Sequence, residues 1–190
     1  PTVLLSAPYM IPFKERLIPV LESYGIDVIV PEVHERLSEE EILEFAGQFD
    51  GAICGDDRFT KNVIHACLPR LKVISKWGTG IDSIDKSYAT SVGVMVGNTP
   101  NAFTLPVSDS VIGYILAFAR RLPWMDIAIK SGDWKKIPGR SLSECTLGVI
   151  GVGNVGKAVV RRAKVFGMKL LGNDIRDIEP DFLLEQGLSM

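Results

Sequence analysis

The sequence predicts an α/β protein with two parallel sheets, and three observations support this fold class. Short apolar segments alternate with segments of helical periodicity over the first hundred residues, which is typical of strands covered by helices. This alternation breaks after Val96, where two prolines and a long apolar helix follow. It resumes over residues 146–172, around a glycine-rich turn. We therefore expect one domain over residues 1–100 and a second over residues 101–190.

The expected strands are short runs of aliphatic and β-branched side chains. Such runs are typical of parallel strands that are buried on both faces. They lie at residues 2–6, 26–30, 51–54, 71–75, 94–96, 146–150 and 168–172.

The expected helices carry apolar residues at helical spacing. Ser38 and Glu41 have the spacing of a capping box, which marks the start of one helix. Pro19 lies inside another, and we expect it to kink that helix. The helices are expected at residues 13–24, 38–45, 60–67, 84–91, 107–121, 122–130 and 154–166.

The segment that joins the two domains differs from the rest of the chain. Residues 98–106 contain two prolines and are expected to form a loop. The helix over residues 107–121 is apolar on most of its circumference, which indicates burial on several sides, as at a domain junction or a dimer interface. A turn-rich arm follows over residues 131–139.

Composition and charge exclude several classes of partner. The net charge is -2 and no Lys/Arg cluster is present, so we expect no nucleic acid. No apolar run approaches the ~20 residues that cross a bilayer, and no secretory signal is visible, so we expect no membrane. Three widely spaced cysteines form no metal-binding motif, so we expect no metal site and a reducing, cytoplasmic location.

The most informative motif is the G-x-G-x-x-G pattern of Gly151, Gly153 and Gly156. It follows an expected strand and opens an expected helix. The first glycine permits a tight turn, the second lets the backbone approach a pyrophosphate, and the third lets helix and strand pack closely. The helix N-terminus favours an anion at the same place. This order predicts a dinucleotide site, and the alternative is a turn that only packs a βαβ unit.

Asp174 lies at the end of the next expected strand, where an acid can accept hydrogen bonds from the adenosine ribose and repel a 2′-phosphate. This favours NAD as the cofactor. Arg176 leaves NADP open, because an arginine can pair with a 2′-phosphate; the alternative for Arg176 is a solvated surface charge.

A second motif follows the fourth expected strand and comprises Trp77, Gly78, Thr79 and Gly80. Ligands of α/β sheets bind beyond the carboxyl ends of the strands. The two glycines let the backbone approach a ligand, so their N–H groups can receive a carboxylate, and Thr79 adds a hydroxyl. The alternative is a simple connection between a strand and a helix.

With these motifs in place, the chain resembles the D-isomer-specific 2-hydroxyacid dehydrogenase family, and most closely its D-3-phosphoglycerate dehydrogenase branch. The resemblance extends over essentially the whole chain. It is carried by residues 71–85, 93–101, 107–109, 116–120 and 132–134 and by the turn of residues 151–156. It implies a flavodoxin-like substrate domain over residues 1–100, followed by the first half of a Rossmann NAD-binding domain over residues 101–190.

The resemblance also implies roles for individual residues. The family moves a hydride between NAD and a 2-hydroxy or 2-keto acid. The loop of Trp77, Gly78, Thr79 and Gly80 matches its substrate-carboxylate site, and Thr79 and Thr104 match positions near the cofactor. The amides of Asn154 and Val155 match the pair that faces the pyrophosphate, and Asp174 matches the ribose acid. Residues 107–139 match the surface through which the family forms homodimers.

The family's catalytic arginine, glutamate and histidine match no residue of this chain, and we expect them beyond residue 190. His34 and His65, the only histidines, are expected to be ordinary surface or core residues. We therefore expect the chain to be a piece of an enzyme with no turnover of its own. Two alternatives remain: a non-catalytic NAD-sensing protein like the family's corepressor relatives, and an enzyme of the same architecture such as a formate dehydrogenase.

Overall fold

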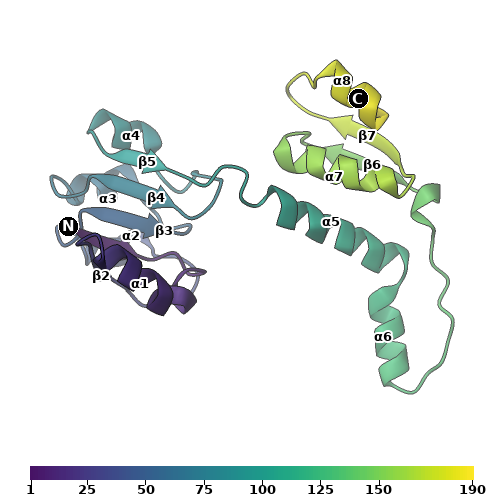
Figure 1. Ribbon diagram of the computed structural model, residues 1–190, viewed down its shortest axis with the longest axis horizontal. Coiled ribbons are helices and arrows are strands. Elements are labelled where there is room, and N and C mark those ends of the chain that lie inside the picture. Colours follow the sequence, from purple (N-terminus) through teal and green to yellow (C-terminus); the bar gives the residue numbers. More distant parts are fainter. The chain divides into compact units, whose positions relative to one another are not determined.

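The computed structural model describes residues 1–190 and divides into two compact units, Pro1–Ala102 and Phe103–Met190 (Figure 1). Each unit has its own sheet and its own hydrophobic core. The mixed α/β class with parallel sheets that the sequence predicts is confirmed.

The first unit contains a five-stranded parallel sheet with the strand order β2-β1-β3-β4-β5. This is the flavodoxin-like order, in which the order of the strands reverses between β1 and β3. Its strands are β1 (Thr2–Leu5), β2 (Asp27–Ile29), β3 (Gly51–Cys54), β4 (Val73–Lys76) and β5 (Met95–Gly97).

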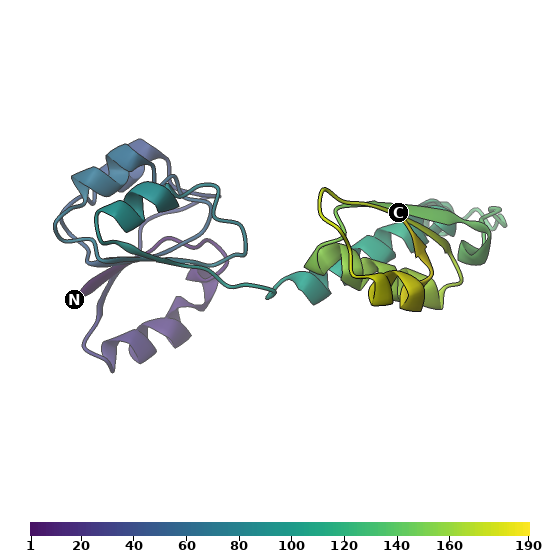
Figure 2. The same ribbon diagram turned by 90° about the horizontal axis from the view of Figure 1, so that it is seen from above.

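Helices lie on both faces of this sheet, as Figure 2 shows with the sheet seen edge-on. The strand register aligns Leu4, Ala52, Ile74 and Val96 across four strands, and all four belong to the core. Buried side chains of α2, α3 and α4 join the same core, whereas α1, on the other face, has no fully buried residue. The helical segments are η1 (Ile11–Phe13), α1 (Lys14–Glu22), α2 (Glu39–Leu43), α3 (Lys61–Ala66) and α4 (Lys86–Ser91).

Local signals explain where these helices begin. The capping box expected at Ser38 is present: the Ser38 hydroxyl accepts the Glu41 N–H, and the Glu41 carboxylate accepts the Ser38 N–H at 2.7 Å. Pro19 lies within α1, as expected.

Two of the three cysteines, Cys54 and Cys67, lie in the core, where burial raises the pKa of their thiols to about 12 and about 11.

The second unit contains a three-stranded parallel sheet with the order β6-β7-β8. Helix α5 packs against α7, and Ile112 of α5 shares a core with Val160 of α7 and Leu170 of β7. Its elements are α5 (Thr104–Ala119), α6 (Leu122–Lys130), η2 (Leu142–Glu144), β6 (Thr146–Ile150), α7 (Asn154–Val165), β7 (Lys169–Asn173), α8 (Pro180–Gln186) and β8 (Leu188–Ser189).

This unit differs from the sequence predictions in two respects. The loop expected up to Pro106 ends earlier, because α5 already begins at Thr104. Proline is compatible with the first turn of a helix, where its missing N–H would have no partner. A second difference is that the sequence pattern did not predict α8 and β8, which complete a β6-α7-β7-α8-β8 arrangement.

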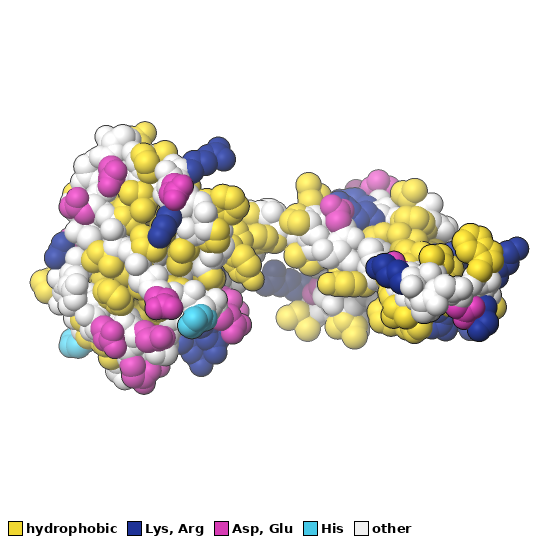
Figure 3. All heavy atoms as spheres, turned by 90° about the horizontal axis from the view of Figure 1, so that it is seen from below, with side chains coloured by type: hydrophobic (Ala, Val, Ile, Leu, Met, Phe, Trp, Pro, Cys, Tyr) yellow, Lys and Arg dark blue, Asp and Glu magenta, His cyan; other side chains and the backbone are white.

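Many apolar side chains of α5 and α6 remain exposed. Only Ser108 and Ile112 of α5 are buried, and α6 buries none. Figure 3 shows hydrophobic side chains gathered on the visible face of the second unit. We call the exposed set the α5–α6 apolar surface; it comprises Leu105, Val107, Tyr114, Phe118, Leu122, Trp124, Ile127 and Ile129. None of the helices combines the length and the apolar character that passage through a bilayer requires.

Candidate functional site

The glycine turn connects β6 to α7, and each glycine has a distinct structural reason. Gly151 has φ of +87°, which favours glycine, and its N–H donates to Asn173 O at 2.8 Å. A Cβ on Gly156 would lie 2.1 Å from Gly151 O, so no side chain fits there. A Cβ on Gly153 would meet no atom within 4 Å, so the space beside this residue is open. The positive φ of Gly151 and the close approach at Gly156 agree with the turn and packing roles that the spacing predicts.

That open space lies at the N-terminus of α7. Gly153 is the residue before the helix and provides no side-chain cap for its first turn. The helix then continues for 12 residues, from Asn154 to Val165. The amides of a first turn have no partner within the helix, and the helix dipole adds a partial positive charge. The turn therefore presents backbone N–H groups to an anion. An anion can come close to the turn because Gly153 has no side chain.

Asp174 follows β7 directly, and its carboxylate is bonded to the turn. One oxygen accepts the Val152 N–H at 2.6 Å, and the other accepts the Arg176 N–H at 2.9 Å. These bonds, that of Arg176 first, lower the pKa of Asp174, so it is ionised at neutral pH. An ionised carboxylate can accept about four hydrogen bonds, so capacity remains for the hydroxyls of a ribose.

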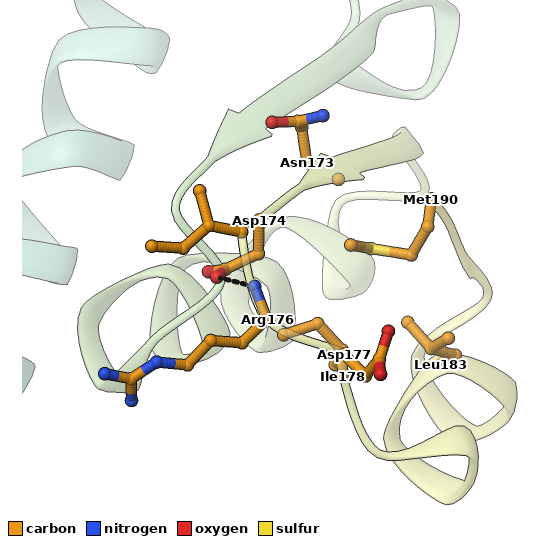
Figure 4. Close-up of a pocket in the computed structure, with 9 residues that line it drawn as sticks. Asn173, Asp174, Arg176, Asp177, Ile178, Leu183 and Met190 are labelled. Carbon is orange, nitrogen blue, oxygen red and sulfur yellow. Dashed lines mark hydrogen bonds between the residues drawn. The ribbon is translucent and has the colours of Figure 1, made fainter.

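A cavity of about 380 Å³ lies directly beside Asp174 (Figure 4). In this view the guanidinium of Arg176 extends away from the Asp174 carboxylate. The cavity is lined by residues from the end of β7, the loop after it, α8 and Met190. Its volume lies within the range of small-molecule sites.

The second predicted motif is the loop after β4, and hydrogen bonds tie it to the loop after β5. The Gly78 N–H donates to Thr99 Oγ1 at 3.0 Å, and Thr99 N–H returns a bond to Gly78 O at 3.0 Å. Asn98 Nδ2 donates to Thr79 O at 2.7 Å. The Gly78 amide is therefore used internally, whereas Gly80 is exposed.

The Thr79 hydroxyl is also engaged. It donates its proton to Thr99 O at 3.1 Å, so it offers lone pairs rather than a proton to a ligand. Such a group suits a hydroxyl or amide donor of a cofactor better than a carboxylate. Thr104, the other expected hydroxyl near the cofactor, is the first residue of α5 in the second unit.

Sequence reasoning missed several residues at the carboxyl edge of the first sheet. The side chain of Lys76 is buried, donates from Nζ to Gly55 O at 2.6 Å and pairs with the Asp56 carboxylate. Trp77 stacks on Tyr9, with ring centroids 5.2 Å apart. The signal was available, because the loops after β1, β3 and β4 must meet at one edge of a parallel sheet.

Asp57 holds this edge together. Its buried carboxylate accepts the Leu37 N–H at 2.5 Å, the Ser6 hydroxyl at 2.8 Å and the Gly55 N–H at 2.9 Å. Burial nevertheless raises the pKa of Asp57. The bonds fix the loop after β3 against the end of β1.

A family model and a protein of known sequence both match this chain. The family model described as "D-isomer specific 2-hydroxyacid dehydrogenase, catalytic domain" matches residues 3–172. A D-3-phosphoglycerate dehydrogenase of Methanocaldococcus jannaschii is 39% identical over 166 residues, which cover 86% of this chain and 31% of that protein. The chain thus spans about a third of that relative.

Two solved structures are also similar. The TT0316 protein from Thermus thermophilus has a TM-score of 0.82 and 29% identity; the match covers 95% of this chain and 58% of that one. D-lactate dehydrogenase from Aquifex aeolicus, solved with NAD and lactic acid, has a TM-score of 0.79 and 25% identity, covering 99% of this chain and 55% of that one.

Proposed function

Because this chain belongs to the D-isomer specific 2-hydroxyacid dehydrogenase family, we propose that it binds NAD and a 2-hydroxy or 2-keto acid for hydride transfer. In this proposal the first unit is the substrate domain and the second is the first part of the NAD-binding domain. The observation that carries it is the bond between Asp174 and the glycine turn. One ionised side chain thereby joins the proposed pyrophosphate and ribose positions.

The residues of the turn fit the cofactor. The backbone N–H groups of Asn154 and Val155 would face the pyrophosphate, with Gly151, Gly153 and Gly156 allowing its approach. Asp174 would accept the ribose hydroxyls, and its negative charge would repel a 2′-phosphate, which favours NAD over NADP. When bound, the nicotinamide supplies the donor or acceptor of the hydride.

The first unit would bind the acid. Gly80 would present its N–H to the substrate carboxylate, and Trp77 would line the site. Thr79 would accept a hydrogen bond from the cofactor, because its proton is given to Thr99 O. The internal bonds of Gly78 would keep this loop in place.

We also propose a homodimer through residues 107–139. The α5–α6 apolar surface supports this, because exposed apolar side chains concentrated on two consecutive helices are typical of an interaction surface. A cytoplasmic location, expected from the unpaired cysteines, stays a prediction.

Calorimetric titration of the 190-residue chain with NAD and with NADP tests the cofactor. We expect measurable heat for NAD and weaker binding of NADP. The reaction is tested on the full-length protein, by following NAD reduction with D- and L-2-hydroxy acids. Binding of neither nucleotide, or oxidation of L-acids alone, would contradict the proposal.

A further inference from the structure

The only side-chain cation bonded into the carboxyl edge of the first sheet is neutralised there. Lys76, the last residue of β4, is 3% exposed. Its ammonium group donates to Gly55 O at 2.6 Å and pairs with the carboxylate of Asp56. Both partners come from the loop after β3, so the charge of Lys76 is already matched before any ligand arrives.

Two further carboxylates come from the loops after β3 and β4. Asp57 is fixed in the loop after β3 by three hydrogen bonds. A carboxylate oxygen of Asp82 lies 3.6 Å from the place of a Cβ on Gly80, the glycine proposed to bind the substrate. Lys76 is therefore already paired with Asp56, and Asp57 and Asp82 add two more carboxylates in the loops after β3 and β4. A phosphate needs several cationic or N–H donors, and the one buried cation at this edge is already bonded within the protein.

An aromatic pair lies at the same edge. Trp77 directly follows Lys76, and its ring stacks on Tyr9 with centroids 5.2 Å apart and an angle of 28° between planes. Tyr9 comes from the loop after β1 and is 69% exposed. The pair thus presents an uncharged ring surface beside the loop of Gly78 and Gly80.

From this geometry we infer that the site selects a 2-keto acid with an uncharged, preferably aromatic, side chain and discriminates against one with a distal phosphate. This inference rests on the proposed function, since it assigns the substrate class of the same site. The Gly80 loop takes the carboxylate that all such acids share. The Tyr9–Trp77 pair takes the variable side chain, and Asp56 holds the ammonium group of Lys76 so that it does not pair with a second anion. Similarity to D-3-phosphoglycerate dehydrogenases would by itself lead to the opposite expectation.

Steady-state kinetics of the full-length protein test it, with NADH and three probes: phenylpyruvate, pyruvate and 3-phosphohydroxypyruvate. We expect kcat/KM for phenylpyruvate to exceed that for the phosphorylated acid by about tenfold or more, in line with the strength of aromatic contacts. A preference for the phosphorylated acid would overturn the inference and leave the proposed function standing. Turnover of none of the three would overturn both.

Substitutions separate the two parts of the inference. Tyr9→Ala should lower kcat/KM for phenylpyruvate by about fivefold and that for pyruvate by less than about twofold. Tyr9→Phe should keep the wild-type ratio of kcat/KM for phenylpyruvate to that for pyruvate. The matched control Tyr24→Ala, at an exposed tyrosine after α1, should change neither kcat/KM value. Asp56→Asn should raise kcat/KM for 3-phosphohydroxypyruvate, because it releases the charge of Lys76. An unchanged ratio of the kcat/KM values for phenylpyruvate and pyruvate in Tyr9→Ala would contradict the assignment of the Tyr9–Trp77 pair.

Discussion

The carboxylate of Asp174 accepts the backbone N–H of Val152 at 2.6 Å, so the acid that follows β7 is bonded to the middle of the turn that follows β6. The sequence predicts an acid facing a ligand at this position. The structure shows that the same side chain also holds the turn in shape. Loss of Asp174 should therefore affect both the affinity for a nucleotide and the order of the turn.

We predict that Asp174→Ala weakens NAD binding about tenfold or more, because hydrogen bonds to a charged group contribute about 1.5–3 kcal/mol. Calorimetric titration of the chain measures this. Discrimination against NADP should also shrink, since the repelling charge is gone. Asp181→Ala, which removes an exposed carboxylate in the first turn of α8, is the control. Unchanged NAD affinity in Asp174→Ala would exclude this carboxylate from the site.

We predict that Gly156→Ala destabilises the second unit by about 3 kcal/mol or more, because its Cβ would lie 2.1 Å from Gly151 O and the backbone would have to move. Urea unfolding measures the change. Gly148→Ala is the matched control, since a Cβ at that strand position meets no atom within 4 Å. Equal stability of the two variants would mean that the contact between turn and helix is not tight.

The α5–α6 apolar surface gives a prediction on association. Tyr114→Glu places a charge on this surface, where the tyrosine is 68% exposed, and should shift a dimer to monomer at micromolar concentration. Sedimentation equilibrium measures the mass. Tyr24→Glu changes a tyrosine that is 78% exposed in the first unit and should leave the mass unchanged. A wild-type chain that is monomeric throughout would contradict the proposed dimer.

Acid should weaken the first unit through Asp50. Arg70 donates to its carboxylate and, with the Thr2 N–H, lowers the pKa of Asp50 below the unfolded value of about 4. A lowered pKa stabilises the fold above the unfolded pKa, and this contribution is lost as pH falls through the folded pKa.

Asp50→Asn should therefore lower the free energy of unfolding at neutral pH. Between about pH 6 and about pH 2, the free energy of unfolding of Asp50→Asn should also fall less than that of the wild-type chain. Urea unfolding at several pH values checks both. Asp27→Asn, at an exposed carboxylate, should keep the wild-type acid dependence. If Asp50→Asn kept the wild-type dependence of unfolding free energy on pH, the contact between Arg70 and Asp50 would contribute little to stability.

Local signals made much of the fold predictable. The glycine spacing predicts a turn, and the structure gives the steric reasons at Gly151, with its positive φ, and at Gly156, where a Cβ would lie 2.1 Å from Gly151 O. The start of α2 was predictable from Ser38 and Glu41, since a capping box forms within four residues. Short apolar runs alone predicted all five strands of the first sheet.

Contacts between distant residues were not predictable in the same way. Tyr9 and Trp77 are far apart in the sequence and meet only because β1 and β4 lie in one sheet with β3 between them. The pairing of Lys76 with Asp56 depends on the register of β3 and β4, which the sequence pattern leaves open. Helix α5 was placed too late because Pro106 suggests a loop, although a first turn accepts proline.

The enclosure of Lys76 also has a practical consequence for chemical labelling. Its amine is covered by protein and bonded to Gly55 O and Asp56, so amine-directed reagents should reach it only when the first unit opens. The other lysines of this unit, such as Lys14 and Lys86, are exposed and should react at once. The rate at which Lys76 becomes acetylated, followed by mass spectrometry, would thus report how often the sheet edge opens in the native protein.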